Sequence, residues 1–240
     1  MTLNKMILTN NNCYKAGKKI TVKGIMVHST GANNPTLKRY VGPDDGKLGV
    51  NRYGNHWNTA TPDGRQVCVH AFIGKLADGS IATYQTLPWD HRGWHAGGSA
   101  NNTHIGFEIC EDGLTDSVYF NAVYKEAVEL CAYLCKEFGL TENDIICHSE
   151  GCKMGIASNH GDVMHWFPKH GKSMDTFRAD VKALITEPIA ELTTVNDIVW
   201  ELAARGILTD KALWLKKLEE DENSYWLARK TVRYLAEKGV

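Results

Sequence analysis

The sequence predicts an α/β domain with a mixed central sheet flanked by helices, followed by a small C-terminal domain of three helices. Two observations predict the first domain: several short apolar or alternating segments typical of strands, and one long amphipathic segment typical of a helix. A third, a proline-containing break followed by three short helical patterns, indicates the second domain. We therefore expect one domain at residues 1–187 and another at residues 188–240.

Five segments have the composition of strands. Residues 20–28 (ITVKGIMVH) alternate and then become apolar, and His28 stands at their carboxyl end before the turn-prone sequence Ser29-Thr30-Gly31. The other four are residues 67–73 (VCVHAFI), 81–85 (IATYQ), 104–110 (HIGFEIC) and 144–148 (DIICH). Side chains at the carboxyl ends of sheet strands face a cleft, so the terminal histidines His28 and His148 are candidate site residues.

The helical patterns follow the strands. Residues 117–138 place their apolar side chains on one stripe before Gly139, and residues 173–185 are the expected last helix of the first domain. Thr186-Glu187-Pro188 is the expected linker, because proline disfavours helix at the residue before it. Beyond it, helical spacing recurs around residues 195–202, 210–220 and 225–235.

Composition excludes several classes of protein. The net charge is −1 and charged residues make up 23% of the chain, so neither nucleic acid nor an anionic membrane is expected as the main partner. No apolar run approaches the roughly 20 residues that span a bilayer. Residues 1–20 (MTLNKMILTNNNCYKAGKKI) lack the apolar segment of a signal peptide, which predicts cytoplasmic synthesis.

The chain has seven cysteines, an odd number without a C-x-x-C pair. This pattern argues against a disulfide framework and against a four-cysteine zinc site. We expect most of them to be small buried hydrophobic residues.

Ten histidines are many for 240 residues, and most fall within residues 56–104 and 148–170. A catalytic zinc ion needs about three protein ligands and one open position for water. His28, His148 and a residue of the segment 159–162 (NHGD) could supply them, although the sequence has no H-E-x-x-H motif.

Six segments occur in the order typical of one family: MVHSTG, VHAFI, ADGSIATYQTLP, GWHAGG, NNTHIGFEIC and ICHSEG. In these segments the chain resembles the zinc-dependent N-acetylmuramoyl-L-alanine amidases, the family that includes phage lysozymes of the amidase type and peptidoglycan recognition proteins. The resemblance covers most of residues 20–185 and implies an α/β fold with a zinc-binding groove.

The resemblance makes His28 and His148 zinc ligands. The third ligand is implied by the family's K-x-D-P-G aspartate, whose best match is Asp162, so that His160 stands where the family has a lysine that stabilises the oxyanion. The Pro-Gly pair is missing and the interval from His148 is long, so His160 and His165 remain rival third ligands.

The other implied roles concern catalysis and substrate binding. Glu108 matches the family's general base, with Glu150 as its nearest rival, and His160 could stabilise the oxyanion as an imidazolium or as a neutral donor. His70 and His95 match residues that line the substrate groove, although each could instead be a half-buried histidine with ordinary partners.

Together these matches imply a zinc amidase at residues 1–187 that cuts the bond between N-acetylmuramic acid and L-alanine in peptidoglycan. We expect a phage or prophage endolysin that reaches the wall after its release from the cytoplasm. The alternatives are a cytoplasmic muropeptide-recycling amidase and a non-catalytic peptidoglycan-binding module. Residues 188–240 would direct the enzyme to the wall or pair two chains in a homodimer.

Overall fold

The computed structural model describes residues 1–185, 194–221, 224–228 and 230–232. The chain divides into two compact units, unit 1 at Met1–Lys182 and unit 2 at Ala183–Val240. The expected linker and the boundary between residues 187 and 188 lie within 186–193, outside the described residues.

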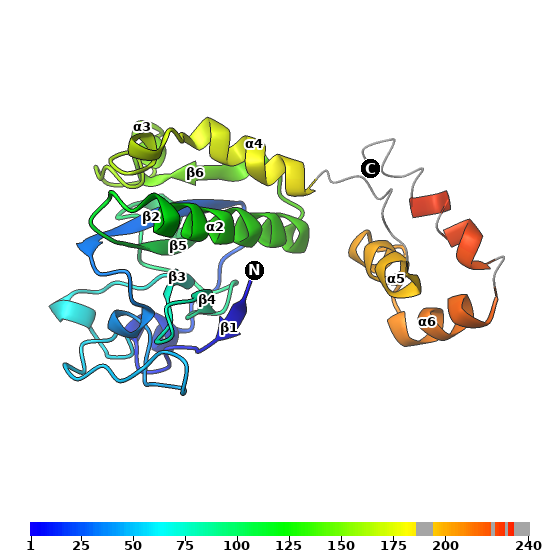
Figure 1. Ribbon diagram of the computed structural model, residues 1–240, viewed down its shortest axis with the longest axis horizontal. Helices are drawn as coiled ribbons and strands as arrows, with labels where there is room; N and C mark the ends of the chain where they lie inside the picture. Colours follow the sequence, from blue (N-terminus) through cyan, green and yellow to red (C-terminus); the bar gives the residue numbers. More distant parts are fainter. Residues whose placement is uncertain (186–193, 222–223, 229, 233–240) are drawn as a thin grey trace. The chain divides into compact units, whose positions relative to one another are not determined.

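Unit 1 is built on one six-stranded sheet of order β1-β4-β3-β5-β2-β6 (Figure 1). Only β3 and β4 pair antiparallel among these strands, and the other neighbours are parallel. The expected mixed sheet is therefore confirmed. The strands are β1 (Leu3–Lys5), β2 (Gly24–Asn33), β3 (Ala71–Lys75), β4 (Ile81–Gln85), β5 (His104–Glu111) and β6 (Ile145–Cys147).

The strand that contains His28 differs from its expected extent. β2 begins at Gly24 and continues to Asn33, so the expected turn after His28 is wrong. The reason is tertiary: β5 extends beyond Glu108, and it pairs with β2 at Ser29 and again at Asn33 across an irregularity. A partner for these backbone groups outweighs the local turn preference.

The helices of unit 1 are α1 (Asn12–Ala16), α2 (Ser117–Phe138), α3 (His148–Lys153) and α4 (Met174–Ile185), with 3₁₀ turns η1 (Leu37–Arg39), η2 (Pro62–Gly64), η3 (Ser99–Asn102), η4 (Glu142–Asp144) and η5 (Phe167–His170). The Asp116 side chain accepts hydrogen bonds from the backbone N–H groups of Val118 and Tyr119 at the start of α2. Gly139 ends this helix in the left-handed conformation. No helix among the described residues is long and apolar enough to cross a membrane.

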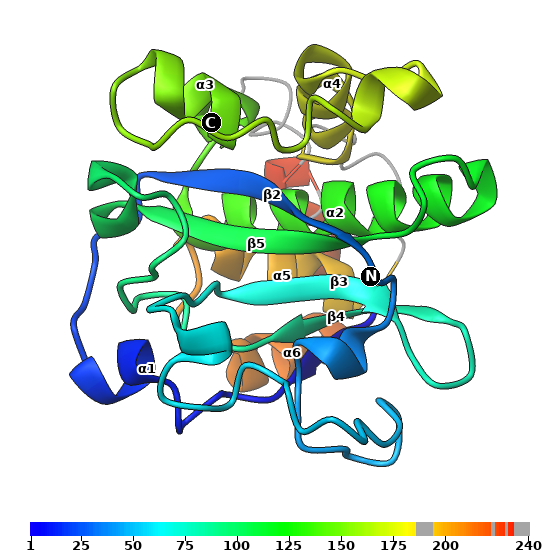
Figure 2. The same cartoon turned by 90° about the vertical axis from the view of Figure 1, so that its left-hand side faces the viewer.

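One face of the sheet is covered by α2, which runs behind the strands in Figure 2. Thr83 of β4 donates to the Glu126 carboxylate of this helix at 3.0 Å. α4 packs beside α2, where the rings of Phe177 and Tyr124 lie 5.4 Å apart. α2 therefore buries the strand side chains on this face, whereas the neighbouring positions along each strand point to the opposite face.

The opposite face carries two apolar clusters. One lies over β3 and β4 under the segment that follows β2, and it includes Leu37, Tyr40, Leu48, Trp57, Phe72 and Tyr84. The other lies over β2 and β6 and consists of Met26, Ala96, Ala100 and Ile146, with Ile156 and Ala157 packed against it. Residues in register on adjacent strands point to the same face of a sheet. Glu108 is in register with Phe72, which belongs to the first cluster, and with His28, so His28 and Glu108 also point to this face.

The cysteine prediction is wrong in one respect, because Cys13 and Cys68 form a disulfide. Their Cα atoms lie 6.4 Å apart although 55 residues separate them in sequence. Only the fold brings α1 beside the segment before His70, and sequence spacing does not reveal that approach. The other five cysteines are free, and four of them are buried as expected.

Unit 2 consists of α5 (Val195–Ala204), α6 (Lys211–Glu220) and helical residues 224–228 and 230–232. The side chains of Thr194 and Asp210 cap the first two helices. α5, α6 and residues 230–232 supply the buried residues of one small core, and Tyr225 and Ala228 pack against it. The buried residues are Ile198, Val199, Leu202, Leu218 and Val232. The three expected helical patterns coincide with these helical residues, except that residues 233–235 of the last pattern lie outside the described residues.

Candidate metal centre and active site

Three candidate ligands meet beside the middle of β2 and the carboxyl end of β6. His28 lies in β2, His148 directly follows β6, and Asp162 lies in the loop after α3. Nδ1 of His28 is 3.1 Å from Oδ2 of Asp162 and 3.2 Å from Nδ1 of His148. Nδ1 of His148 is 3.4 Å from the same Asp162 oxygen.

These three atoms fit a zinc ion. Bonds of 2.0–2.1 Å to a tetrahedral zinc ion place neighbouring ligand atoms about 3.3 Å apart. The observed separations of 3.1 to 3.4 Å match this distance between neighbouring ligand atoms. Two imidazoles and one carboxylate are a known catalytic donor set, which leaves a fourth position for water or substrate. Both histidines are buried, whereas Asp162 is partly exposed, so the site opens on the side of Asp162.

The charges suit a cation at this position. Burial lowers the pKa of His28, which favours the neutral imidazole that binds a metal. Burial alone would raise the pKa of Asp162, but contacts with His148 and His28 hold that pKa well below its usual range. Asp162 is therefore a carboxylate at neutral pH.

Glu108 is the second acidic group of the site. It lies in β5 in register with His28, and its Oε2 atom is buried without a hydrogen-bond partner among the described residues. Burial raises its pKa well above the usual value, and the negative charges of Asp162 and Glu111 add to the effect. A carboxylate with a raised pKa and one buried oxygen that lacks a partner takes up a proton readily, which suits a general base.

The two rival third ligands are placed elsewhere. Nε2 of His165 lies 2.9 Å from the Glu111 carboxylate, outside the cluster of ligand atoms. His160 is exposed at the rim, with its ring centre 4.6 Å from that of His148 and its Nδ1 atom 3.0 Å from Oγ of Ser158. The geometry therefore favours Asp162 as the third ligand and leaves His160 free to face a substrate.

His70 does not fit the expected substrate contact. The side chain is fully buried, and its Nδ1 accepts a hydrogen bond from the Gly106 N–H at 3.0 Å while Nε2 donates to the His91 carbonyl at 2.7 Å. Burial lowers its pKa to about 4. With both ring nitrogens bonded to backbone groups, His70 fastens the segment before β3 to β5.

His95 is also expected in the substrate groove, and the structure places it against a metal ligand. Its Nδ1 atom lies 3.0 Å from Nε2 of His28. The ring lies over Gly106 of β5, where a Cβ atom would come within 2.4 Å of it. Glycine at this strand position therefore gives the imidazole room to reach His28.

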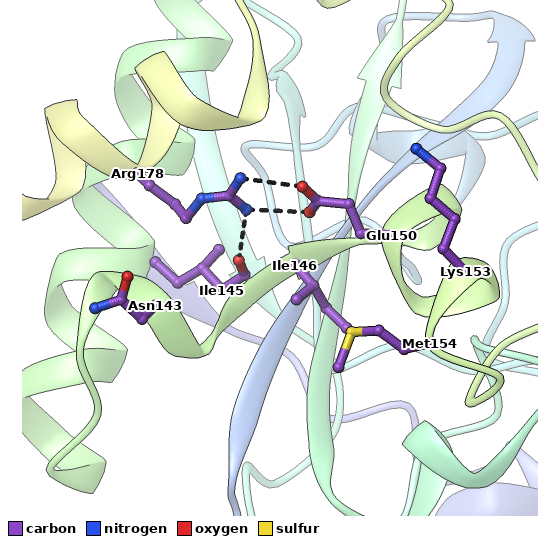
Figure 3. Close-up of a pocket in the computed structure, with 7 residues that line it drawn as sticks. All are labelled: Asn143, Ile145, Ile146, Glu150, Lys153, Met154 and Arg178. Atoms are coloured by element: carbon purple, nitrogen blue, oxygen red, sulfur yellow. Dashed lines mark hydrogen bonds and ion pairs between the residues drawn. The ribbon is translucent and has the colours of Figure 1, made fainter.

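Glu150, the rival general base, lies outside the group of candidate metal ligands. Figure 3 shows its carboxylate joined to the guanidinium of Arg178, with an N–O distance of 3.0 Å. The pair lines an open hollow of about 490 Å³ with Ile145, Ile146 and Met154, and none of these residues is a candidate ligand. The Glu150 carboxylate therefore has an ion-pair partner, whereas the Glu108 Oε2 atom has no hydrogen-bond partner in the described part of the chain.

Sequence reasoning missed Ser158. Its hydroxyl lies 3.2 Å from Nε2 of His148, on the side of the ring opposite the metal position. A serine in a polar loop ten residues after the histidine has no periodicity that would reveal this contact. The contact of His95 did have a usable signal, which is Gly106 in the strand segment IGFE. Glycine inside a strand often marks a place where another group approaches the backbone closely.

Residues 18–165 match the N-acetylmuramoyl-L-alanine amidase family. The chain belongs to this family. The curated relative CwlH of Bacillus subtilis (strain 168), an N-acetylmuramoyl-L-alanine amidase, is 38% identical over 71 residues, which are 28% of this chain and 27% of CwlH. The match thus spans about a quarter of the relative's length.

Solved structures share the fold at low sequence identity. The hydrolase AmiA of Staphylococcus aureus, solved in complex with its ligand, superposes with a TM-score of 0.57 and 18% identity, covering 80% of this chain and 86% of AmiA. A mutant endolysin from Bacillus subtilis superposes with a TM-score of 0.51 and 23% identity, covering 75% of this chain and 99% of the endolysin. These likenesses support the fold described above.

Proposed function

We propose that the chain is a zinc-dependent N-acetylmuramoyl-L-alanine amidase that hydrolyses the bond between N-acetylmuramic acid and the L-alanine of the peptidoglycan stem. The observation that carries the proposal is the convergence of His28, His148 and Asp162 at 3.1 to 3.4 Å, in a chain of this family. Glu108, in register with His28, adds an Oε2 atom that has no hydrogen-bond partner among the described residues. Membership in the family supports peptidoglycan as the partner.

In this mechanism His28, His148 and Asp162 hold the ion. Zinc, when bound, would polarise the scissile carbonyl and make a water molecule easier to deprotonate. Glu108 accepts the proton of the attacking water and then delivers it to the nitrogen of the leaving L-alanine. His160 at the rim donates a hydrogen bond to the carbonyl oxygen as negative charge develops on it.

Digestion of purified cell walls tests the activity. We expect new amino-terminal L-alanine and peptide-free glycan strands, identified by mass spectrometry, and no new reducing sugar ends. Metal chelation should stop the release and added zinc should restore it. New reducing ends, or cleavage within the stem peptide, would contradict the proposal.

The proposed setting is wall lysis by a phage or prophage endolysin, synthesised in the cytoplasm and acting after release. The resemblance of unit 1 to an endolysin fold supports this setting. A recycling amidase would prefer small soluble muropeptides to intact walls, so a comparison of the two substrates separates these readings. A non-catalytic binding module would bind walls with zinc in place and release nothing.

His160→Ala is expected to keep the zinc and to lower the rate. Loss of one oxyanion donor costs about 2.7–4 kcal/mol of transition-state stabilisation, a fall of about 10²–10³-fold in kcat. Zinc content and turnover should be measured on the same sample. If the variant loses its zinc, His160 is a ligand and the assignment of Asp162 is wrong.

Unit 2 is proposed to direct the enzyme to the wall. Trp200 and Trp226 are more than half exposed, and the ammonium groups of Lys211 and Lys230 lie 3.6 and 3.7 Å from their ring centres. Such aromatic rings offer flat surfaces for stacking on sugars. The rival role is a homodimer through these helices, since a unit of about 50 residues is marginal alone and Leu213 is also half exposed.

A chain ending at Glu187 tests this division of labour. We expect it to cleave a small soluble muropeptide at the rate of the full chain, because every candidate catalytic residue lies before residue 171. Its activity on intact walls should fall, and light scattering of both chains reports any change in chain number. A truncated chain that is folded and zinc-loaded yet inactive on the small substrate would place unit 2 in the active site.

A further inference from the structure

We infer that Glu111 and His165 position the turn at residues 161–165, which carries the third candidate ligand, Asp162. This inference rests on the zinc site proposed above and adds two residues that hold no metal themselves. Neither side chain belongs to the cluster of ligand atoms. Both act on the site through Asp162, so they are positioning residues.

Asp162 differs from the two histidines in how the fold supports it. His28 lies within β2 and His148 directly follows β6, so the sheet holds the backbone of both. Asp162 instead lies in the turn, where the Gly161 carbonyl accepts the N–H of His165 at 3.3 Å. A ligand on a turn keeps its place only if the turn itself is fastened to the rest of the site.

Apolar packing fastens the turn to α2. Val163 within the turn and Trp166 directly after it are fully buried. The ring of Trp166 lies 5.3 Å from that of Phe120 in α2. This contact holds the chain after Asp162 against the helix, but it does not join the turn to the strands that carry His28 and Glu108.

The buried Glu111 carboxylate makes that connection. Its Oε1 atom accepts a hydrogen bond from Nε2 of His165 at 2.9 Å and another from the N–H of Gly31 at 3.1 Å. The backbone N–H of Glu111 donates in turn to Oγ1 of Thr30 at 3.1 Å. Hydrogen bonds to a carboxylate are about twice as strong as those between neutral groups, so one oxygen holds two segments firmly.

The segments that meet at Glu111 are those of the proposed catalytic residues. Glu111 ends β5, the strand of Glu108, and Gly31 lies in β2, the strand of His28. The pairing of β2 with β5 is irregular between Ser29 and Asn33, and the Glu111 carboxylate spans this interval. Apart from the contacts of Asp162 itself, the bond from His165 is the one hydrogen bond between residues 161–165 and the sheet in the described part of the chain.

Hydrogen exchange of the metal-free, full-length chain, followed by mass spectrometry, tests this connection without metal. In His165→Leu the amides of the turn should exchange about tenfold faster, the effect of losing one hydrogen bond to a charged group. His165→Gln should restore slow exchange, because its amide nitrogen can take the place of Nε2. The side chain of His165→Asn is one methylene shorter and should behave like that of His165→Leu.

Zinc affinity and turnover test the effect on Asp162. By competition with a chromophoric chelator, we expect His165→Leu to bind zinc about 10–100-fold more weakly. With saturating zinc and a small soluble muropeptide, kcat should fall about tenfold at unchanged KM, because a displaced ligand disturbs the transition state more than substrate binding. His165→Gln should recover both quantities.

His170→Leu is the matched control. Nε2 of His170 donates to the Leu114 carbonyl at 3.2 Å, so this histidine also ties the segment after the turn to the residues that follow β5. It lies outside the turn and outside the ligand cluster. We therefore expect His170→Leu to leave the exchange of the turn and the zinc affinity unchanged.

Unchanged exchange and unchanged zinc affinity in His165→Leu and His165→Asn would overturn the inference. Equal losses in His170→Leu would overturn it as well, because they would indicate general destabilisation. If the unmutated chain binds no zinc, the proposed zinc site fails, and the exchange rates still decide whether His165 holds the turn. If circular dichroism shows that His165→Leu does not fold, the comparison of His165→Asn with His165→Gln decides.

Discussion

Replacement of His28 by alanine is expected to remove zinc and amide hydrolysis together. His28 lies at the centre of the site: its Nδ1 atom is 3.1 Å from the Asp162 carboxylate and 3.2 Å from Nδ1 of His148. With one of three ligands gone, two remaining side chains hold the ion weakly. Because a metal supplies several kcal/mol of transition-state stabilisation, kcat/KM should fall by about 10³-fold or more.

Metal analysis by atomic emission, combined with wall digestion, measures both losses on the same sample. His148→Ala should behave alike, since the two histidines face the same Asp162 oxygen. His56→Ala is a suitable control, because this half-buried histidine accepts a hydrogen bond from the N–H of Asn58 and lies outside the ligand cluster. Full zinc occupancy in both ligand variants would disprove the site.

Glu108→Gln is expected to keep the zinc and the fold while lowering kcat by about 10²-fold or more, the usual contribution of general acid-base catalysis. Glutamine has the same shape but cannot accept the proton of the attacking water. The buried Oε2 atom has no partner among the described residues, so the substitution breaks no hydrogen bond there. Near-normal turnover would move the general base elsewhere.

The same variant has an expected effect on stability that separates it from a general loss of function. Burial and the nearby acidic groups raise the pKa of Glu108, so folding favours its protonated form. As pH rises above the unfolded value of about 4.5, the unfolded chain loses this proton first and the folded state becomes less stable. At pH 7, metal-free Glu108→Gln should therefore unfold at a higher temperature than the unmutated metal-free chain. Its free energy of unfolding should be greater by about 1 kcal/mol. The difference should disappear below pH 4, and thermal unfolding at both pH values measures it.

The sequence by itself determined most strands of the sheet, its longest helix and part of the site. Alternating and apolar segments identified β2, β4 and β5, and one apolar stripe between Asp116 and Gly139 identified α2. These patterns are readable because they depend on periodicity within a few neighbouring residues. His28 and His148 could be singled out for the same reason, since each lies in or directly after a recognisable strand, whereas Glu108 was a candidate through the family resemblance.

Only the tertiary structure decided between residues whose local sequence is equivalent. Asp162, His160 and His165 share one irregular loop, and their partners, which come from distant segments, separate the ligand from its rivals. Burial of both ring nitrogens made His70 a structural residue, and the close approach over Gly106 turned His95 toward His28. The pairing of Cys13 with Cys68 likewise depends on contact between segments 55 residues apart. The role of a residue at this site depends on which atoms of distant segments it contacts. Loops have no periodicity, so no local pattern in a single sequence reveals those contacts.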